Sequence, residues 1–408
     1  MVSIDKDRLK NTFETYSEIG RTDKNGLHRL SLSKTDKKVR DQFVQDLEEL
    51  GLEVRIDEVG NIFGRQEGAD PDAAPVLIGS HLDSQPYGGR FDGQLGVLTA
   101  LETLRSFADE GIDHRRPIEI VNWTNEEGSR FKPALMGSGT FADEFDVDET
   151  LSQTDSEGTT VEEALEEIGY RGDSPCKPRE PIHAYFELHI EQGPVLEERD
   201  RAVGIVEGIY GMSWLEVTIT GDADHAGPSP MHSRRDALVA ATDVVQAVRR
   251  LSNRVSDDVV TTVGEFEVEP NSINVIPSEV TFTVDVRSYD DKVVADLVER
   301  VETEVEAACS REGTTYEIEE IWRIPHTEYA EKVRTTAIEG AEAADISYQS
   351  IVGGAGHDAN YLSEITNSGM LFAPSVDGKT HNEAEYTEWS DIVDAAFAYA
   401  ETVERLAE

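Results

Sequence analysis

Residues 79–96 read GSHLDSQPYGGRFDGQLG, and this stretch indicates how the first part of the chain folds. It follows a short apolar run that is typical of a buried strand, and it precedes leucines at three-residue steps that predict a helix over 93–107. His81, Asp83 and Asp92 stand between the strand and the helix, among several glycines. Because ligands bind at the carboxyl ends of strands in α/β sheets, the stretch is a candidate metal loop. An ordinary surface loop is the alternative that this stretch alone leaves open.

The chain on both sides of this stretch alternates predicted strands and helices, which favours an α/β sheet. Residues 142–180 are acidic and polar, with one short predicted helix at 160–168, and we expect them to run across the surface. The other predictions for this part are helices at 5–19 and 36–50, a hairpin at 52–66, and strands at 75–79, 118–123 and 184–190.

From about residue 211 the pattern changes to alternating strands and long helices. In order, the segments predict a strand at 213–221, a helix at 233–251, strands at 259–268 and 279–286, a helix at 290–311 and a strand near 315–323. This β-α-β-β-α-β order is that of a ferredoxin-like sandwich. The last predicted elements are a helix at 329–343, a strand at 369–373 and a helix at 389–407. We therefore predict a discontinuous catalytic domain, 1–210 and 326–408, with a mixed sheet flanked by helices, and an inserted α+β domain at 211–325.

The length and charge of the chain limit which classes of protein it can belong to. A chain of 408 residues is too long for one ordinary core, which agrees with two domains. Its formal charge of −46 would repel nucleic acid and anionic membranes, so we expect neither as a partner. Acidic residues along the whole chain are tolerable where salt screens their repulsion, which favours a high-salt cytoplasm. The start of the sequence lacks the apolar segment of a signal peptide, and Cys176 and Cys309 alone support no disulfide framework.

Three further groups of reactive side chains come at the end of predicted strands or shortly after them: Glu126 with Glu127, then His189, then His381. Each group alone has a simpler explanation. A lone histidine is ordinarily a solvated or core residue, and a pair of carboxylates is ordinary on the surface of an acidic protein. Together with the histidine and aspartates of the first loop, however, they offer imidazoles and carboxylates, which are ligands of divalent metal ions. The combination favours a metal site built from strand ends.

Eight stretches match the motifs of one known family, in the family's order and over nearly the whole length: GSHLDSQPYGGRFDGQLGV, NEEGSRFKPALMGSG, ELHIEQGPVLE, DHAGPSPM, NVIP, DVRS, GGAGHDA and THNEAE. On these motifs the chain resembles the M20-type metal-dependent amidohydrolases, in the hydantoinase and carbamoylase branch. That branch includes N-carbamoyl-L-amino acid hydrolases, β-ureidopropionases and allantoate amidohydrolases. The resemblance implies a di-metal aminopeptidase-like catalytic domain, and a ferredoxin-like insertion that serves as a lid and forms a homodimer.

The resemblance also implies which residues bind metal. Two divalent ions, Zn2+ or else Mn2+, Co2+ or Ni2+, would be bound by His81, Asp92, Glu127, His189 and His381. Asp92 would bridge the two ions, because closely spaced cations need negative charge between them. Asp83 would fix the orientation of the His81 imidazole.

The same resemblance implies the reaction. Glu126 would act as general base for a metal-bridging hydroxide that attacks an amide or ureido carbonyl. N-carbamoyl-L-amino acids would then yield the amino acid, carbon dioxide and ammonia. His225, supplied by the partner subunit, would act catalytically by stabilising the oxyanion and would also contact substrate. The other residues expected to bind this small, carboxylate-bearing substrate are Gln192, Asn274, Arg287, Gly356 and His357.

Alternatives remain at this point. Allantoate amidohydrolase and β-ureidopropionase would use the same residues, and a peptidase or aminoacylase fits less well with the stretches HIEQGP and GAGHDA. A non-catalytic binding protein on the same scaffold should lack the base, whereas Glu126 is present. A two-metal phosphoesterase should offer several cations near the pocket, and only Arg90, Arg130 and Arg287 are candidates. For Arg287, an ordinary surface ion pair is the alternative to substrate binding.

Overall fold

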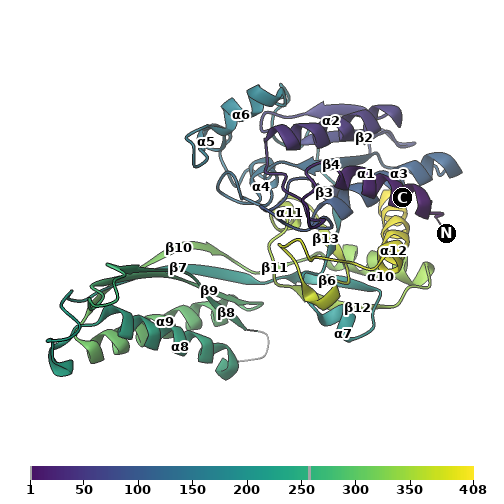
Figure 1. Cartoon of the computed structure of the whole chain (residues 1–408). Helices are drawn as coiled ribbons and strands as arrows, with labels where there is room; N and C mark the ends of the chain where they lie inside the picture. The colour runs from purple at the N-terminus through teal and green to yellow at the C-terminus, as the bar shows by residue number, and fades with distance from the viewer. Residues whose placement is uncertain (1, 256–258) are drawn as a thin grey trace. The chain divides into compact units, whose positions relative to one another are not determined.

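The computed structural model describes residues 2–255 and 259–408, which form two compact units. The first unit combines Met1–Gly208 with Glu328–Glu408, and the second is the intervening Ile209–Thr327. Figure 1 shows that both ends of the chain lie in the first unit. There, the backbone N–H of Val2 donates to Oε1 of Glu401 at 2.5 Å, so the two ends are joined by a hydrogen bond.

The first unit is built on one mixed sheet of nine strands (Figure 1). Its order is β1-β2-β4-β3-β5-β13-β6-β11, with β12 paired to β6. The central strands β4, β3, β5 and β13 run parallel to one another. On either side of them the next strand is antiparallel: β2 pairs with β4, and β6 pairs with β13. The strands are β1 (Glu53–Ile56), β2 (Ile62–Gln66), β3 (Val76–His81), β4 (Ile118–Trp123), β5 (Ala184–Ile190), β6 (Val203–Ile209), β11 (Thr327–Glu328), β12 (Tyr348–Gly353) and β13 (Ser368–Ala373).

The register of the parallel strands brings their carboxyl ends to one edge of the sheet. His81, the last residue of β3, is paired with Trp123, the last residue of β4. On the other side, His189 of β5 is paired with Phe372 of β13. These strands are buried along their whole length, as expected for parallel strands covered by helices. The loops that follow them therefore meet at one place.

Helices cover this sheet, and α3 is the one that follows the metal loop. It begins after Gly93, whose φ of +63° places the backbone in the left-handed region. A Cβ at this position would lie 2.3 Å from Cε1 of His81, so glycine is required for the close approach. The helices are α1 (Lys6–Ser17), α2 (Lys34–Glu49), α3 (Gln94–Glu110), α4 (Met136–Phe141), α5 (Val147–Ser152), α6 (Val161–Ile168), α7 (Val195–Glu198), α10 (Glu331–Ala343), α11 (Asp358–Leu362) and α12 (Trp389–Ala407), with a 3-10 turn at Val376–Gly378.

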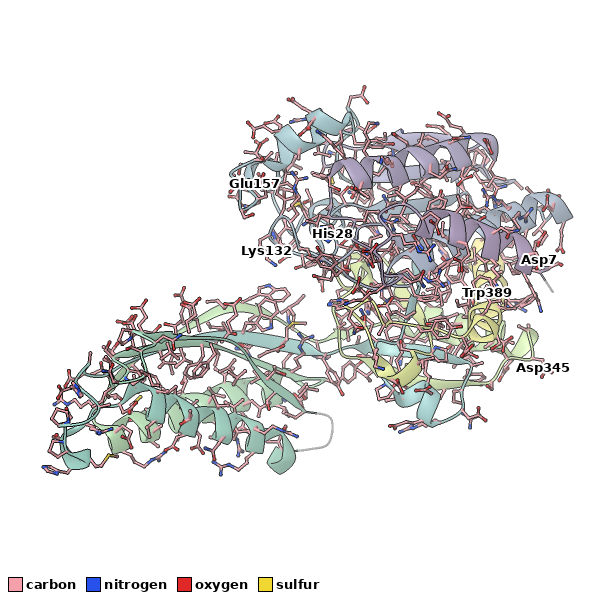
Figure 2. The ribbon with its side chains drawn as sticks, viewed as in Figure 1. Asp7, His28, Lys132, Glu157, Asp345 and Trp389 are labelled. Carbon is pink, nitrogen blue, oxygen red and sulfur yellow. The ribbon has the colours of Figure 1, made fainter. Side chains whose placement is uncertain are left out.

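The last helix, α12, joins the two segments of the first unit. Trp389, labelled in Figure 2, is its first residue, and its ring lies 6.2 Å from that of Phe13 in α1. Farther along the helix, Tyr399 stacks on Phe186 of β5 with ring centroids 5.2 Å apart. Tyr399 and Phe186 are both buried, and burying a large apolar side chain contributes about 1.5–3 kcal/mol, so this second contact holds the C-terminal segment against a central strand.

The second unit is a four-stranded antiparallel sheet with two helices on one side (Figure 1). The strand order β10-β7-β9-β8 corresponds to 4-1-3-2 in chain order, which together with β-α-β-β-α-β connectivity makes the unit ferredoxin-like. Alternate residues such as Val217 and Phe282 face the helices and form its own core. Its elements are β7 (Gly211–Thr220), a 3-10 turn (Met231–Ser233), α8 (Ala237–Val255), β8 (Val260–Glu269), β9 (Glu279–Ser288), α9 (Asp291–Glu312) and β10 (Thr315–Ile324).

The predicted fold class, a mixed sheet flanked by helices with a ferredoxin-like insertion, is confirmed. Residues 142–180 contain the predicted helix, as α6, and one helix that was not predicted, α5. The side chain of Asp146 caps α5 by accepting N–H groups of its first turn. The helix is hard to predict from the sequence because it has only six residues and little apolar periodicity. Of the described helices, none is long and apolar enough to cross a membrane.

Candidate metal centre

The loops at the carboxyl edge of the sheet bring five of the predicted residues together. Among the described residues, three groups of possible ligands are close enough to hold a cation each; one is Glu187, His189 and His357, and the predicted ligands make up the other two. The first group is His81, Asp92 and His189, and the second is Asp92, Glu127 and His381. Within each group the potential ligand atoms lie within 4.8 Å of one another. Asp92 belongs to both groups.

The carboxylate of Asp92 faces both groups, one oxygen to each. Oδ1 lies 3.1 Å from Nε2 of His189 and 3.5 Å from Nε2 of His81. Oδ2 lies 3.5 Å from Nε2 of His381, which in turn is 3.6 Å from Oε2 of Glu127. This is the arrangement in which one carboxylate can bridge two cations.

The two inner histidines present the same ring nitrogen to the centre. Nδ1 of His81 lies 3.1 Å from the backbone oxygen of Asp83, and Nδ1 of His189 lies 3.0 Å from that of Ile190. A carbonyl oxygen only accepts, so Nδ1 carries a proton in both rings, and in the neutral form of each ring Nε2 keeps the lone pair that binds a metal. Nε2 of His81 is buried and has no hydrogen-bond partner among the described residues. A metal ion would supply that partner.

Asp83 contacts the His81 ring, which it was expected to orient, through its backbone. Its backbone oxygen, and not its carboxylate, makes the hydrogen bond to His81, because Oδ1 is 3.7 Å from the ring nitrogen. The carboxylate instead accepts the backbone N–H of Glu126 at 3.3 Å and that of Glu127 at 3.4 Å. Asp83 therefore holds the loop that carries both glutamates.

Glu126 lies beside the first group of ligands. Its Oε2 is 3.4 Å from Nε2 of His81, and the residue is 8% exposed. Burial raises the pKa of Glu126 well above its ordinary value, and the negative charges of Asp358, Glu127 and Asp92 add to this effect, while His81 opposes it. A carboxylate with a raised pKa is suited to take up a proton and release it again.

The other groups are strongly coupled to one another. Burial and the charge of Asp92 raise the pKa of Glu127 well above its usual range. Burial opposes the ionisation of Asp92, but His189 and His81 outweigh it and hold the pKa of Asp92 well below its usual range. Burial likewise lowers the pKa of His81, yet Glu126, Asp92 and Asp83 together raise it well above the usual value. The carboxylates of this centre are buried close together, and buried charges are costly unless opposite charges compensate them.

These residues fit a pair of divalent cations. Imidazole and carboxylate ligands suit zinc and neighbouring divalent metals, and the donor set includes an unpartnered buried ring nitrogen and a carboxylate shared by two groups. His81, His189 and Asp92 would hold one ion, and Asp92, Glu127 and His381 the other. Positive charge at these positions would relieve the repulsion among the buried carboxylates.

Three residues expected to bind substrate also lie in the first unit. Nε2 of Gln192 donates to Oδ2 of Asp92 at 2.9 Å, so this side chain supports a ligand. The ring of His357 is buried, 4.4 Å from that of His189 between centroids, and its Nε2 has no hydrogen-bond partner among the described residues. Gly356 precedes it and is half-buried. Gln192 and His357 thus contact metal ligands directly, and Gly356 is next to His357 in the sequence.

The other three belong to the second unit. His225 and Asn274 are exposed and adjacent, because the backbone N–H of Ala226 donates to the oxygen of Asn274 at 2.9 Å. Arg287 lies on β9, and its guanidinium holds Asp285 two residues earlier, with Nη2 2.8 Å from Oδ2. The ion pair considered for this arginine is thus present, and it leaves the arginine half-buried.

Sequence reasoning missed residues that hold the ligands in place. Oε1 of Glu385 accepts the backbone N–H groups of Phe91, at 2.9 Å, and of Asp92, at 3.1 Å. Burial raises the pKa of Glu385 to about 7. Thr380 donates to Oδ2 of Asp92 at 3.2 Å. Thr380 directly precedes His381 and Glu385 follows it by four residues, so both lie in the matching stretch THNEAE, the one signal that could have found them.

Known proteins resemble the chain over its full length. A model of peptidase family M20/M25/M40 matches residues 77–405. An N-carbamoyl-L-amino-acid amidohydrolase of Rhizobium meliloti is 39% identical over 94% of this chain and 92% of that protein. An allantoate amidohydrolase of Escherichia coli is 32% identical over 100% of this chain and 99% of that protein. The crystal structure of a hydantoinase/carbamoylase family amidase from Burkholderia multivorans has a TM-score of 0.94 and 44% identity, covering 100% of this chain and 98% of that one. The chain therefore belongs to peptidase family M20/M25/M40, in the branch of the hydantoinase and carbamoylase amidases.

Proposed function

We propose that the chain hydrolyses N-carbamoyl-L-amino acids at the ureido group. One water is consumed: hydrolysis breaks one C–N bond of the ureido group to give an amine and a carbamic acid, and loss of carbon dioxide from the carbamic acid breaks the second C–N bond. The products are therefore the amino acid, carbon dioxide and ammonia. The observation that carries the proposal is the two-sided contact of Asp92, with Oδ1 3.1 Å from His189 and Oδ2 3.5 Å from His381. The identity with the amidohydrolase of Rhizobium meliloti, 39% against 32% for the allantoate enzyme, favours carbamoyl substrates.

The chain's own residues prepare the site for this reaction. Divalent ions held by the two ligand groups would polarise the substrate carbonyl and make an attacking water more acidic. His81 and His189 are held by backbone carbonyls with Nε2 toward Asp92, so little reorganisation is needed to bind an ion. Zinc is the proposed native ion, with manganese, cobalt or nickel as alternatives.

Glu126 is the proposed general base. It adjoins a ligand, Glu127, and its carboxylate reaches the first group of ligands at His81. It would accept a proton from the attacking water and donate it to the departing nitrogen, which balances the proton over the reaction. Asp83 keeps the base in position through the backbone N–H of Glu126.

Substrate binding is proposed for residues of both units. A carboxylate-bearing substrate suits a guanidinium fork such as that of Arg287, and Asn274 would assist it. His225 is proposed to stabilise the oxyanion from the partner subunit of a homodimer, with the inserted unit acting as lid and dimerisation domain. Gln192, Gly356 and His357 are proposed to contact substrate beside the metal ligands. The high-salt setting that the charge of −46 favours is part of the same proposal.

An ammonia-release assay tests the proposed substrate. The purified protein, loaded with Zn2+ or Mn2+, is incubated with N-carbamoyl-L-amino acids, N-carbamoyl-β-alanine and allantoate in separate reactions at low and at high salt. We expect the highest kcat/KM with an N-carbamoyl-L-amino acid. A higher value with allantoate or N-carbamoyl-β-alanine would assign the alternative substrate, and no turnover of any of them would contradict the proposal.

A further inference from the structure

We propose that Gln85 is a positioning residue for one of the two cation positions. It holds the carboxylate of Glu127 in the orientation that lets Glu127 and His381 bind the same ion. The inference rests on the proposed two-metal function and deepens it, because it assigns an orienting residue to one position only.

Gln85 grips both oxygens of the Glu127 carboxylate. Its backbone N–H donates to Oε1 at 3.0 Å, and its side-chain Nε2 donates to Oε2 at 2.7 Å. The same Nε2 also lies 3.3 Å from the backbone oxygen of Glu127. Rotation of the carboxylate would break at least one of these bonds. Oε2, the oxygen held by the side chain, is the one 3.6 Å from Nε2 of His381.

The amide of Gln85 is fully used in this way. Its Oε1 accepts the hydroxyl of Ser129 at 2.5 Å, which fixes which end of the amide faces Glu127. With both N–H donors directed at Glu127 and the oxygen at Ser129, the side chain has little capacity left for a substrate. This separates an orienting role from a substrate-binding one.

The backbone around Gln85 is itself held firmly. The N–H of Gly88 donates to the oxygen of Gln85 at 3.1 Å and to that of Leu27 at 2.9 Å. Ser84 is joined to the buried Arg29 by two bonds of 2.9 Å, one from each backbone N–H. A rigid support of this kind is what makes an orienting residue effective.

The contacts of Gln85 are confined to one side of the centre. Among the described residues, its side-chain hydrogen bonds go to Glu127 and Ser129. The first ligand group is held by other bonds, those of His81 and His189 to backbone carbonyls. Loss of the Gln85 amide should therefore weaken one ion and spare the other.

The test is a Zn2+ titration of the metal-free full chain against a chromophoric chelator, with metal content measured separately. Wild type is expected to bind two ions. Gln85→Leu keeps the size of the side chain and removes its hydrogen bonds, and should weaken one ion about 10- to 100-fold while leaving the other unchanged. Ser129→Ala should shift the same constant in the same direction by less. Gln42→Leu, which removes an amide 3.4 Å from Asp46 on α2, is the matched control and should change neither constant.

Two results would overturn the inference: unchanged constants in Gln85→Leu, or an equal loss of both ions. Circular dichroism verifies that each variant is folded, and if Gln85→Leu does not fold, Ser129→Ala decides the matter, because it removes a single half-buried hydroxyl. The proposed two-metal function is tested separately, by the number of ions that the wild-type protein binds. A wild-type protein that binds fewer than two ions would contradict the two-metal function, and with it this inference, before any variant is compared.

Discussion

Oε2 of Glu126 lies 3.4 Å from Nε2 of His81. The candidate base thus touches the same ring nitrogen that would bind a metal ion, although its neighbour Glu127 belongs to the ligand group. Asp83 fixes this arrangement by accepting the backbone N–H of both glutamates. Two adjacent carboxylates can therefore serve different purposes, one beside the reacting water and one on an ion.

Glu126→Gln should keep the metal and lose turnover. The amide is close to the carboxylate in shape but cannot accept and return a proton, and general base catalysis is typically worth about 10²–10⁴-fold. We expect kcat to fall by at least about 10²-fold, while the metal content stays at the wild-type value. Activity close to wild type, in a sample with confirmed metal, would remove Glu126 from the role of base.

Chelation should abolish activity and lower thermal stability together. An ion that binds only the folded protein stabilises it, by about 2.7 kcal/mol when its concentration is 100 times Kd. The buried carboxylates of the centre also repel one another without it. Differential scanning calorimetry with and without EDTA measures the shift in Tm, and readdition of Zn2+, Mn2+, Co2+ or Ni2+ should restore both properties. A chelated protein with full activity would contradict metal dependence.

Arg287→Ala should chiefly raise KM. Hydrogen bonds to charged groups are worth about 1.5–3 kcal/mol, which corresponds to a rise of roughly 10- to 100-fold for carboxylate-bearing substrates. Arg300→Ala is the control, because Arg300 is an exposed arginine of α9 paired with Asp296 at 2.7 Å. The pair of Arg287 with Asp285 offers a second comparison. If Arg287→Ala and Asp285→Asn change stability alike and leave KM unaltered, the arginine serves its ion pair alone.

Asp57 should make stability depend on pH in a defined direction. Burial raises the pKa of Asp57 to about 6, from an ordinary value of 3.8, although hydrogen bonds from Asn61 oppose the shift. The folded state therefore holds this proton more tightly than the unfolded state, so the contribution is present at low pH and is lost as pH rises through about 6. Between pH 5 and 7 the loss amounts to about 1 kcal/mol.

The comparison is between wild type and Asp57→Asn, by urea unfolding at pH 5 and pH 7. Asn lacks the titration, so wild type should lose about 1 kcal/mol more than the variant over this interval. The variant has its own offset at both pH values, because Nδ2 of Asn61 donates to Oδ2 of Asp57 at 2.9 Å. The difference between the two slopes is independent of that offset, and equal slopes would show that Asp57 does not titrate there.

The sequence predicts the elements with a strong repeating pattern. The predicted ranges of β4, β5 and α12 agree with the structure to the residue, because the two strands are rich in apolar and aromatic residues and the helix has a clear apolar period. β6 and β12 were not predicted. β6 reads VGIVEGI, in which two glycines weaken the strand pattern, and β12 is half-buried along most of its length and gains its place from pairing with β6.

In the site, too, the sequence predicts some of the residues and only the fold identifies the others. Residues at strand ends, such as His81 and His189, could be expected together because parallel strands end at one edge. The contact between Thr380 and Asp92 spans 288 residues of sequence, and no local pattern specifies it. Gln85 and Glu385 act through hydrogen bonds whose partners only the fold brings near. In a chain with 83 acidic residues, one more glutamate carries no signal of its own.

The most direct test of the two-metal centre is anomalous diffraction from crystals of the full chain grown with Zn2+ or Mn2+. We predict two anomalous peaks on opposite sides of the Asp92 carboxylate, about 3.5–4 Å apart. One should be bonded by His81 and His189, and the other by Glu127 and His381. A single peak, or two peaks that do not share Asp92, would contradict the account.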